Sequence, residues 1–85
     1  MRRSSGDANA TILKIVDNQL KDNTPADTRE TYQRLLIQGF SKDEARDLIA
    51  AVVSSEIFEV LNKKQPYNQK RFIEALHKLP KMPWE

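Results

Sequence analysis

Apolar side chains recur at three- and four-residue spacing in four stretches of the chain, and this spacing predicts four helices. The first stretch covers about residues 8–22, where Ile12, Val16 and Leu20 form one apolar stripe. The longest stretch, residues 42–63, keeps the helical spacing from Ala45 to Leu61 and would extend roughly 33 Å. Because its apolar stripe is broad, we expect this third helix to be the spine of the fold and to contact more than one neighbour.

The second and fourth helices are shorter. We expect Thr24 to be the N-cap of the second helix, with Pro25 at its first position, because Pro is tolerated there. Asn68 would cap a fourth helix over about residues 69–79, which Pro80 ends. The predicted inner faces are Tyr32, Leu35 and Leu36 in the second helix and Phe72, Ile73, Leu76 and Leu79 in the fourth, whereas Arg34 is expected outside.

A short corner separates the second helix from the third. Gly39 stands where a helix C-terminus favours a residue with positive φ, and Phe40 can fold back onto Leu35 as in a Schellman motif. Ser41 follows as an N-cap, and Glu44 three residues later completes a capping box. The sequence therefore predicts two helices that meet at a specified angle without a flexible loop.

These elements predict an all-α fold, a four-helix small domain over residues 7–80 with the long third helix as its spine. Residues 1–6 are expected to be disordered and residues 81–85 to form an extended tail. The chain has no Cys. No apolar run approaches the roughly 20 residues of a membrane span, and the N-terminal arginines are not followed by the apolar core of a secretory signal. We expect a cytoplasmic protein without membrane contact.

Positive charge gathers in the C-terminal third, although the net charge is only +2. Residues 61–85 carry six basic and two acidic side chains. The basic ones are Lys63, Lys64, Lys70, Arg71, Lys78 and Lys81. Such a face can bind phosphate or an acidic partner, and it can also serve as an ordinary solvated rim.

The side chains give little basis for catalysis or for binding a cofactor. Glu74 and His77 form a Glu-x-x-His pair, the motif that holds metals in some helical bundles. On the predicted helix, however, Glu74 points outward and His77 lies on the flank, so we expect a surface pair and no metal. The serines lack a glycine elbow, and Gly6 and Gly39 make no phosphate loop. We therefore expect neither an enzyme, nor a cofactor, nor a small-molecule substrate.

Binding to a macromolecule is the remaining class of function. We expect a protein–protein interaction module, either with another protein or with a second copy in a homodimer, because the broad apolar helix exceeds what one neighbour can cover. The candidate partner surface is Phe58, Tyr67 and Trp84, while Ile57 and Leu61 are expected to be covered within the chain. The alternative is a nucleic-acid-binding accessory protein that uses the basic face. The helix after the corner begins with net negative charge, which disfavours it as a DNA-recognition helix.

Two resemblances add expectations. The combination of Thr24-Pro25, Thr28 to Tyr32, Gly39-Phe40-Ser41 with Glu44-Ala45, and Tyr67-Asn68 with Arg71-Phe72 resembles a group of small bacterial helical proteins of unknown function. This resemblance implies a bacterial helical protein and transfers no site residue. More locally, Gly39-Phe40 is similar to the Gly-Phe loop through which ubiquitin-associated domains bind ubiquitin, with Gln38 in place of a methionine.

Overall fold

The computed structural model describes the backbone of residues 6–85 and the side chains of residues 10–85. Within this range the chain forms four helices and no strand, which confirms the all-α prediction: α1 (Gly6–Asp22), α2 (Ala26–Ile37), α3 (Lys42–Lys63) and α4 (Gln69–Lys78). The prediction for residues 1–5 lies outside the described residues, and Gly6 is the first residue of α1.

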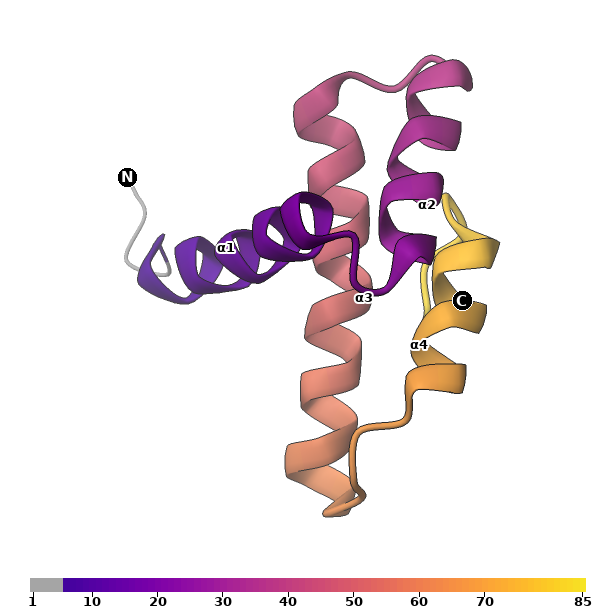
Figure 1. Cartoon of the computed structure of the whole chain (residues 1–85). Coiled ribbons are helices and arrows are strands. Elements are labelled where there is room, and N and C mark those ends of the chain that lie inside the picture. The colour runs from indigo at the N-terminus through magenta and orange to yellow at the C-terminus, as the bar shows by residue number, and fades with distance from the viewer. Residues whose placement is uncertain (1–5) are drawn as a thin grey trace.

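The long helix α3 is the spine, and each of the other three helices packs against it. In Figure 1, α2 and α4 lie on one side of α3, one above the other, while α1 crosses α3 near its middle and extends away on the opposite side. The broad apolar stripe of α3 is explained by this arrangement, because α3 must bury side chains against neighbours in several directions.

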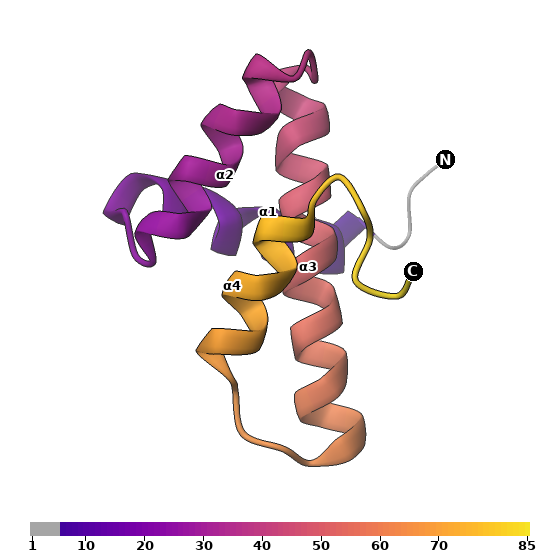
Figure 2. The same cartoon turned by 90° about the vertical axis from the view of Figure 1, so that its right-hand side faces the viewer.

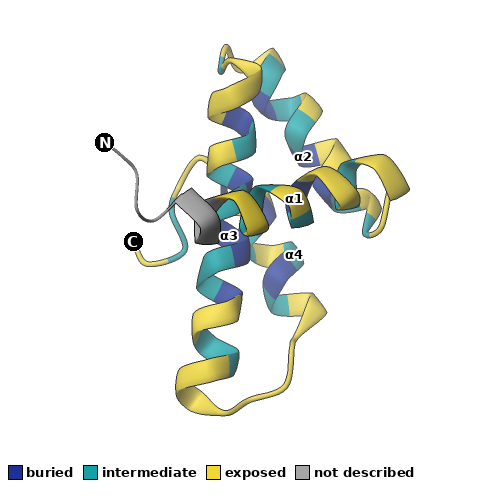
Figure 3. Cartoon of the chain, turned by 90° about the vertical axis from the view of Figure 1, so that its left-hand side faces the viewer, coloured by how far each residue is buried: buried dark blue, intermediate teal, exposed yellow. Residues whose placement is uncertain are grey.

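The core draws on all four helices, and its buried residues, dark blue in Figure 3, lie where the helices come together. Its apolar members, all fully or almost fully buried, are Val16, Leu35, Ala45, Ile49, Val52, Val53, Phe72, Leu76 and Leu79. The ends of α3 and the α3–α4 loop are largely exposed. The core is therefore concentrated around the middle of α3, and the C-terminal part of α3 extends beyond it.

The corner after α2 has the predicted geometry. Gly39 has a φ of +105°. The Phe40 N–H donates to the Leu35 carbonyl at 3.1 Å, and the Gly39 N–H donates to the Leu36 carbonyl at 3.0 Å. These two bonds are the pair that defines a Schellman motif.

The capping box on the other side of the corner is also confirmed. The Ser41 hydroxyl accepts from the Glu44 N–H at 3.0 Å, and the Glu44 carboxylate accepts from the Ser41 N–H at 2.8 Å. Because both ends of the corner satisfy their own backbone groups, the backbone conformation of the corner is set by residues close together in the sequence.

The start and the inner face of α2 differ from the prediction. Thr24 does not cap α2, because its hydroxyl donates to the Asp22 carbonyl and α2 begins at Ala26. Thr28 and Thr31 are buried at 0% and 2% exposure, while Tyr32 is only partly buried. The Thr28 hydroxyl donates to the Gln19 side chain of α1 at 3.0 Å, so this buried polar group is satisfied.

Two arginines join helices that are distant in sequence. Arg34 was expected outside, but its guanidinium donates to the carbonyls of Leu76 and Leu79 at 3.0 and 2.8 Å. It therefore caps the C-terminus of α4, where a positive charge is favourable. Arg46 of α3 forms a two-bond ion pair with Asp17 of α1, with both distances 2.9 Å. These contacts fix α2 to α4 and α1 to α3.

The C-terminal segment is not the extended tail that the sequence predicts. Residues 79–84 bend through successive turns and fold back beside α3 and α4 (Figure 2). The Glu85 N–H donates to the Met82 carbonyl at 3.1 Å, and the Glu85 carboxylate accepts from the Met82 N–H at 2.9 Å. The physical reason is that these reciprocal bonds close a turn, which an extended segment could not form.

Candidate interaction surface

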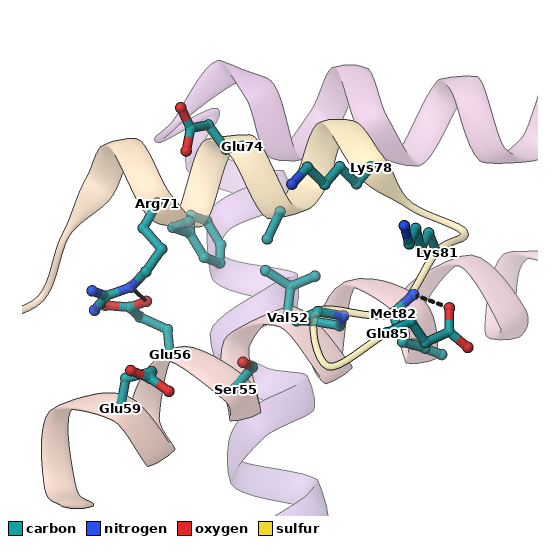
Figure 4. A pocket seen from close by; sticks show the side chains of 13 residues that line it. Val52, Ser55, Glu56, Glu59, Arg71, Glu74, Lys78, Lys81, Met82 and Glu85 are labelled. Carbon is teal, nitrogen blue, oxygen red and sulfur yellow. Dashed lines mark hydrogen bonds and ion pairs between the residues drawn. The ribbon is translucent and has the colours of Figure 1, made fainter. Parts of the chain in front are cut away.

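A buried carboxylate joins α3 to the start of α4. Glu56 is 7% exposed and lies on the same side of α3 as the buried residues Val52 and Val53. Its two carboxylate oxygens accept from the Arg71 guanidinium at 2.9 and 2.7 Å (Figure 4). One of them also accepts from the Asn68 N–H at 3.0 Å. Glu56 thus holds both the loop that precedes α4 and the first turn of α4.

These contacts shift the pKa values of the groups involved. The hydrogen bonds from Arg71 lower the pKa of Glu56, and the bond from the Asn68 N–H lowers it further, which together outweigh the effect of burial. The same hydrogen bonds raise the pKa of Arg71. Burial, helped by the negative charge of Glu56, raises the pKa of Tyr67. The pair is therefore charged at neutral pH and fixes the position of α4.

A cleft of about 300 Å³ lies between α3, α4 and the C-terminal turn. Figure 4 shows its charged side chains arranged around the opening. Its charged lining comprises Glu56, Glu59, Glu74, Glu85, Arg71, Lys78 and Lys81. Carboxylates outnumber cations here, so the cleft has no surplus of positive charge for an anion. Within the described residues, no group of three or more His, Cys, Asp or Glu side chains is placed to hold a metal ion.

The Glu-x-x-His motif does not act as a pair in the structure. His77 Nε2 lies 3.0 Å from Asp27 Oδ2 on α2, and the His77 side chain is 60% exposed. The prediction of a surface position is confirmed, but the partner is Asp27 and not Glu74. The reason is that α2 packs against α4 and presents Asp27 to the flank on which His77 lies.

The predicted basic face is not a continuous cationic surface. Arg71 is bound to Glu56, and Lys63 is bound to Glu59 at 3.1 Å. Lys78 and Lys81 line the cleft that also contains four carboxylates. Paired and interspersed charges of this kind attract phosphates weakly, since the fields of opposite charges cancel.

The predicted partner surface is exposed, but the structure does not gather its three residues. Phe58 is 59% exposed, Tyr67 53% and Trp84 68%. Tyr67 lies before α4 and its ring contacts Phe72, with the ring centroids 6.1 Å apart. Trp84 lies after α4, in the C-terminal turn beside the charged cleft. Trp84 is therefore separate from Tyr67.

The C-terminal half of α3 supplies the residues that accompany Phe58. Ile57 is 38% exposed and Leu61 is 72% exposed, so the expectation that the chain covers Leu61 is wrong. The reason is that α1 crosses α3 near its middle and does not reach the end of α3 (Figure 1). Ile57 and Tyr67 line one cleft of about 180 Å³ together with Ile15 of α1.

We call Ile57, Phe58, Leu61 and Tyr67 the α3 apolar surface. Sequence reasoning identified two of its members and assigned Ile57 and Leu61 to the interior. The signal that could have placed Leu61 beside the other two helical members is its spacing, because it follows Ile57 by four residues and Phe58 by three, and residues three or four apart are neighbours on a helix surface. The spacing could not show that α1 leaves the C-terminal end of α3 uncovered.

Comparisons with models of known protein families, with curated proteins and with solved structures find no match. The class of this protein is therefore defined by its own fold: a small all-α domain in which three helices pack around a long central helix. None of the helices in the described range is both long enough and apolar enough to cross a membrane. The resemblances to small bacterial helical proteins and to ubiquitin-associated domains stay predictions.

Proposed function

We propose that this protein is a protein-binding module and that the α3 apolar surface is where it binds. The observation that carries the proposal is the exposure of four large apolar or aromatic side chains, from 38% to 72%, on one short helical segment and the loop after it. Several large apolar side chains exposed on one segment of a small domain are typical of an interaction site, because leaving them in water is unfavourable.

The surrounding chemistry supports a protein partner over nucleic acid. The α3 apolar surface carries no charged side chain of its own, and the nearest cleft, between Ile15, Ile57 and Tyr67, is lined mainly by apolar groups. Nucleic acid would require unpaired cations around such a surface. Arg71 and Lys63 are already paired with glutamates. Lys64 and Lys70 are exposed on either side of Tyr67 and form no ion pair within the described residues. Two separate lysines make a small contribution to phosphate binding, so the nucleic-acid alternative is the weaker one.

Site-specific photo-crosslinking tests this proposal. A photoreactive phenylalanine analogue replaces Phe58 in the full chain, and the matched control carries it at Ile37, which is 86% exposed at the end of α2. After irradiation in the native host, we expect crosslinked protein adducts from position 58 well above those from position 37. Equal yields at the two positions would contradict the proposal, because Ile37 is an exposed apolar residue outside the α3 apolar surface.

A further inference from the structure

We infer that the partner is a second copy of this chain, packed with its α3 antiparallel to α3 of the first copy about a two-fold axis. This inference rests on the proposed function, since it names the occupant of the α3 apolar surface. Three features of α3 carry it: a hollow beside the exposed side chains, the absence of charge along the middle of the helix, and the opposite charges of Asp47 before this uncharged stretch and of Lys64 at the C-cap of the helix.

The hollow lies one helical turn from Phe58. It has a volume of about 360 Å³ and is formed where α1 leaves α3. Its lining is Ile12, Leu13, Asp47, Ala50, Ala51 and Ser54. Phe58 follows Ser54 by four residues and so lies on the same face of α3. A cavity of about 150 Å³ can accommodate a benzene ring, so the hollow has room for one aromatic side chain.

A projecting group and a hollow on the same face are self-complementary. If the two-fold axis passes between Ser54 and Ser55, Phe58 and Ala51 are each 3.5 residues from it, roughly 5 Å along α3. Antiparallel packing then places Phe58 of each copy over Ala51 in the hollow of the other. One rotation satisfies both copies, so the contact closes as a dimer and does not continue into a fibre.

The charges along α3 favour the antiparallel direction. No charged side chain occurs from Leu48 to Ser55, so the centre of the interface would bury no charge. Asp47 stands at the N-terminal end of this uncharged stretch, and Lys64 follows the C-terminal end of α3. Antiparallel packing brings Asp47 of one copy toward Lys64 of the other, whereas parallel packing would bring like charges together.

Sedimentation equilibrium of the full chain between about 10 µM and 1 mM tests self-association. Because the surface offers only four large exposed apolar or aromatic side chains per copy, we expect a weak dimer with a dissociation constant in the micromolar range. Phe58→Asp and Leu61→Asp should each weaken the dimer at least tenfold, while the control Ile37→Asp leaves it unchanged. Circular dichroism of each variant checks that the helices are retained.

A charge swap tests the antiparallel arrangement. Asp47→Lys alone and Lys64→Asp alone should each raise the dissociation constant several-fold, and the double variant should return it toward the wild-type value. Failure of the double variant to recover would overturn the antiparallel arrangement.

The outcomes separate the inference from the proposed function. A wild-type chain that stays monomeric at about 1 mM, together with adducts from position 58 to a different protein, overturns the inference and leaves the proposed function standing. A monomeric chain without adducts overturns both. An adduct of two identical chains, lost in Leu61→Asp, supports both.

Discussion

The contact between Glu56 and Arg71 gives the sharpest test of how this fold is held together. Glu56→Gln keeps the size of the side chain but replaces a carboxylate that accepts three hydrogen bonds with an amide that has one accepting oxygen. In either orientation the amide NH₂ group then faces a donor of Arg71, and in one of the two it also faces the Asn68 N–H. At least one of the three bonds is lost, and the others lose the assistance of the negative charge.

The expected loss in the free energy of unfolding is about 1.5–3 kcal/mol, the range for hydrogen bonds to a charged group. A domain of this size is stable by roughly 4–13 kcal/mol, so the effect is a large fraction of the total. The melting temperature should fall by roughly 8–16 °C, taking about 2 kcal/mol and 4–8 °C for each kcal/mol. Thermal and urea unfolding followed by circular dichroism measure both quantities.

Glu59→Gln is the matched control, because it is the same substitution one turn away on α3. Glu59 pairs with Lys63 at i, i+4, and pairs of this kind contribute about 0.3–0.5 kcal/mol. We therefore expect the control to remain within about 0.5 kcal/mol of the wild type. Equal unfolding midpoints for Glu56→Gln and Glu59→Gln would refute the reasoning that Glu56 anchors α4.

The pH dependence provides a second readout of the same contact. The pKa of Glu56 is lowered in the folded state from its ordinary value of 4.5. Its contribution to stability is therefore fully present above pH 4.5 and is lost as the pH falls through the folded pKa. Glu56→Gln should flatten the acid side of the stability profile. A variant profile parallel to that of the wild type would show that another carboxylate is responsible.

Four further substitutions test the corner, the cap of α4 and the surface histidine by urea unfolding. Gly39→Val should lower the free energy of unfolding by about 1–3 kcal/mol, because a φ of +105° strains a β-branched residue although no atom lies within 4 Å of the added Cβ. Ser41→Ala should lower it by about 1 kcal/mol through the lost cap. Unchanged unfolding midpoints in both variants would contradict the role of the corner in stability. Arg34→Met removes two hydrogen bonds to the last carbonyls of α4 and should destabilise by about 1–2 kcal/mol, whereas a neutral result would mean that water replaces them. His77→Ala should change stability by less than about 0.5 kcal/mol, as is usual for an exposed side chain, and a larger loss would show that its contact with Asp27 is structural.

The part of the fold that the sequence predicted is the part fixed by short-range chemistry. The bounds of α3 and the corner built on Gly39 and Ser41 follow from groups a few residues apart, since caps satisfy backbone groups within one turn. Asn68 likewise accepts from the Arg71 N–H at 3.0 Å, as predicted. The exposure of Phe58 also followed from helical spacing, because it lies to one side of the apolar stripe of α3.

Only the tertiary structure determined which polar groups are buried and which apolar side chains remain exposed. In the sequence Glu56 cannot be told from a surface glutamate. Its burial is possible because Arg71, fifteen residues later and on another helix, pairs with its carboxylate. Arg34 became a cap because α4 ends beside α2. Leu61 is exposed because α1 crosses α3 near the middle of α3, away from the C-terminal end where Leu61 lies. Each outcome depends on how helices cross, and crossing is set by the packing of side chains that are distant in sequence.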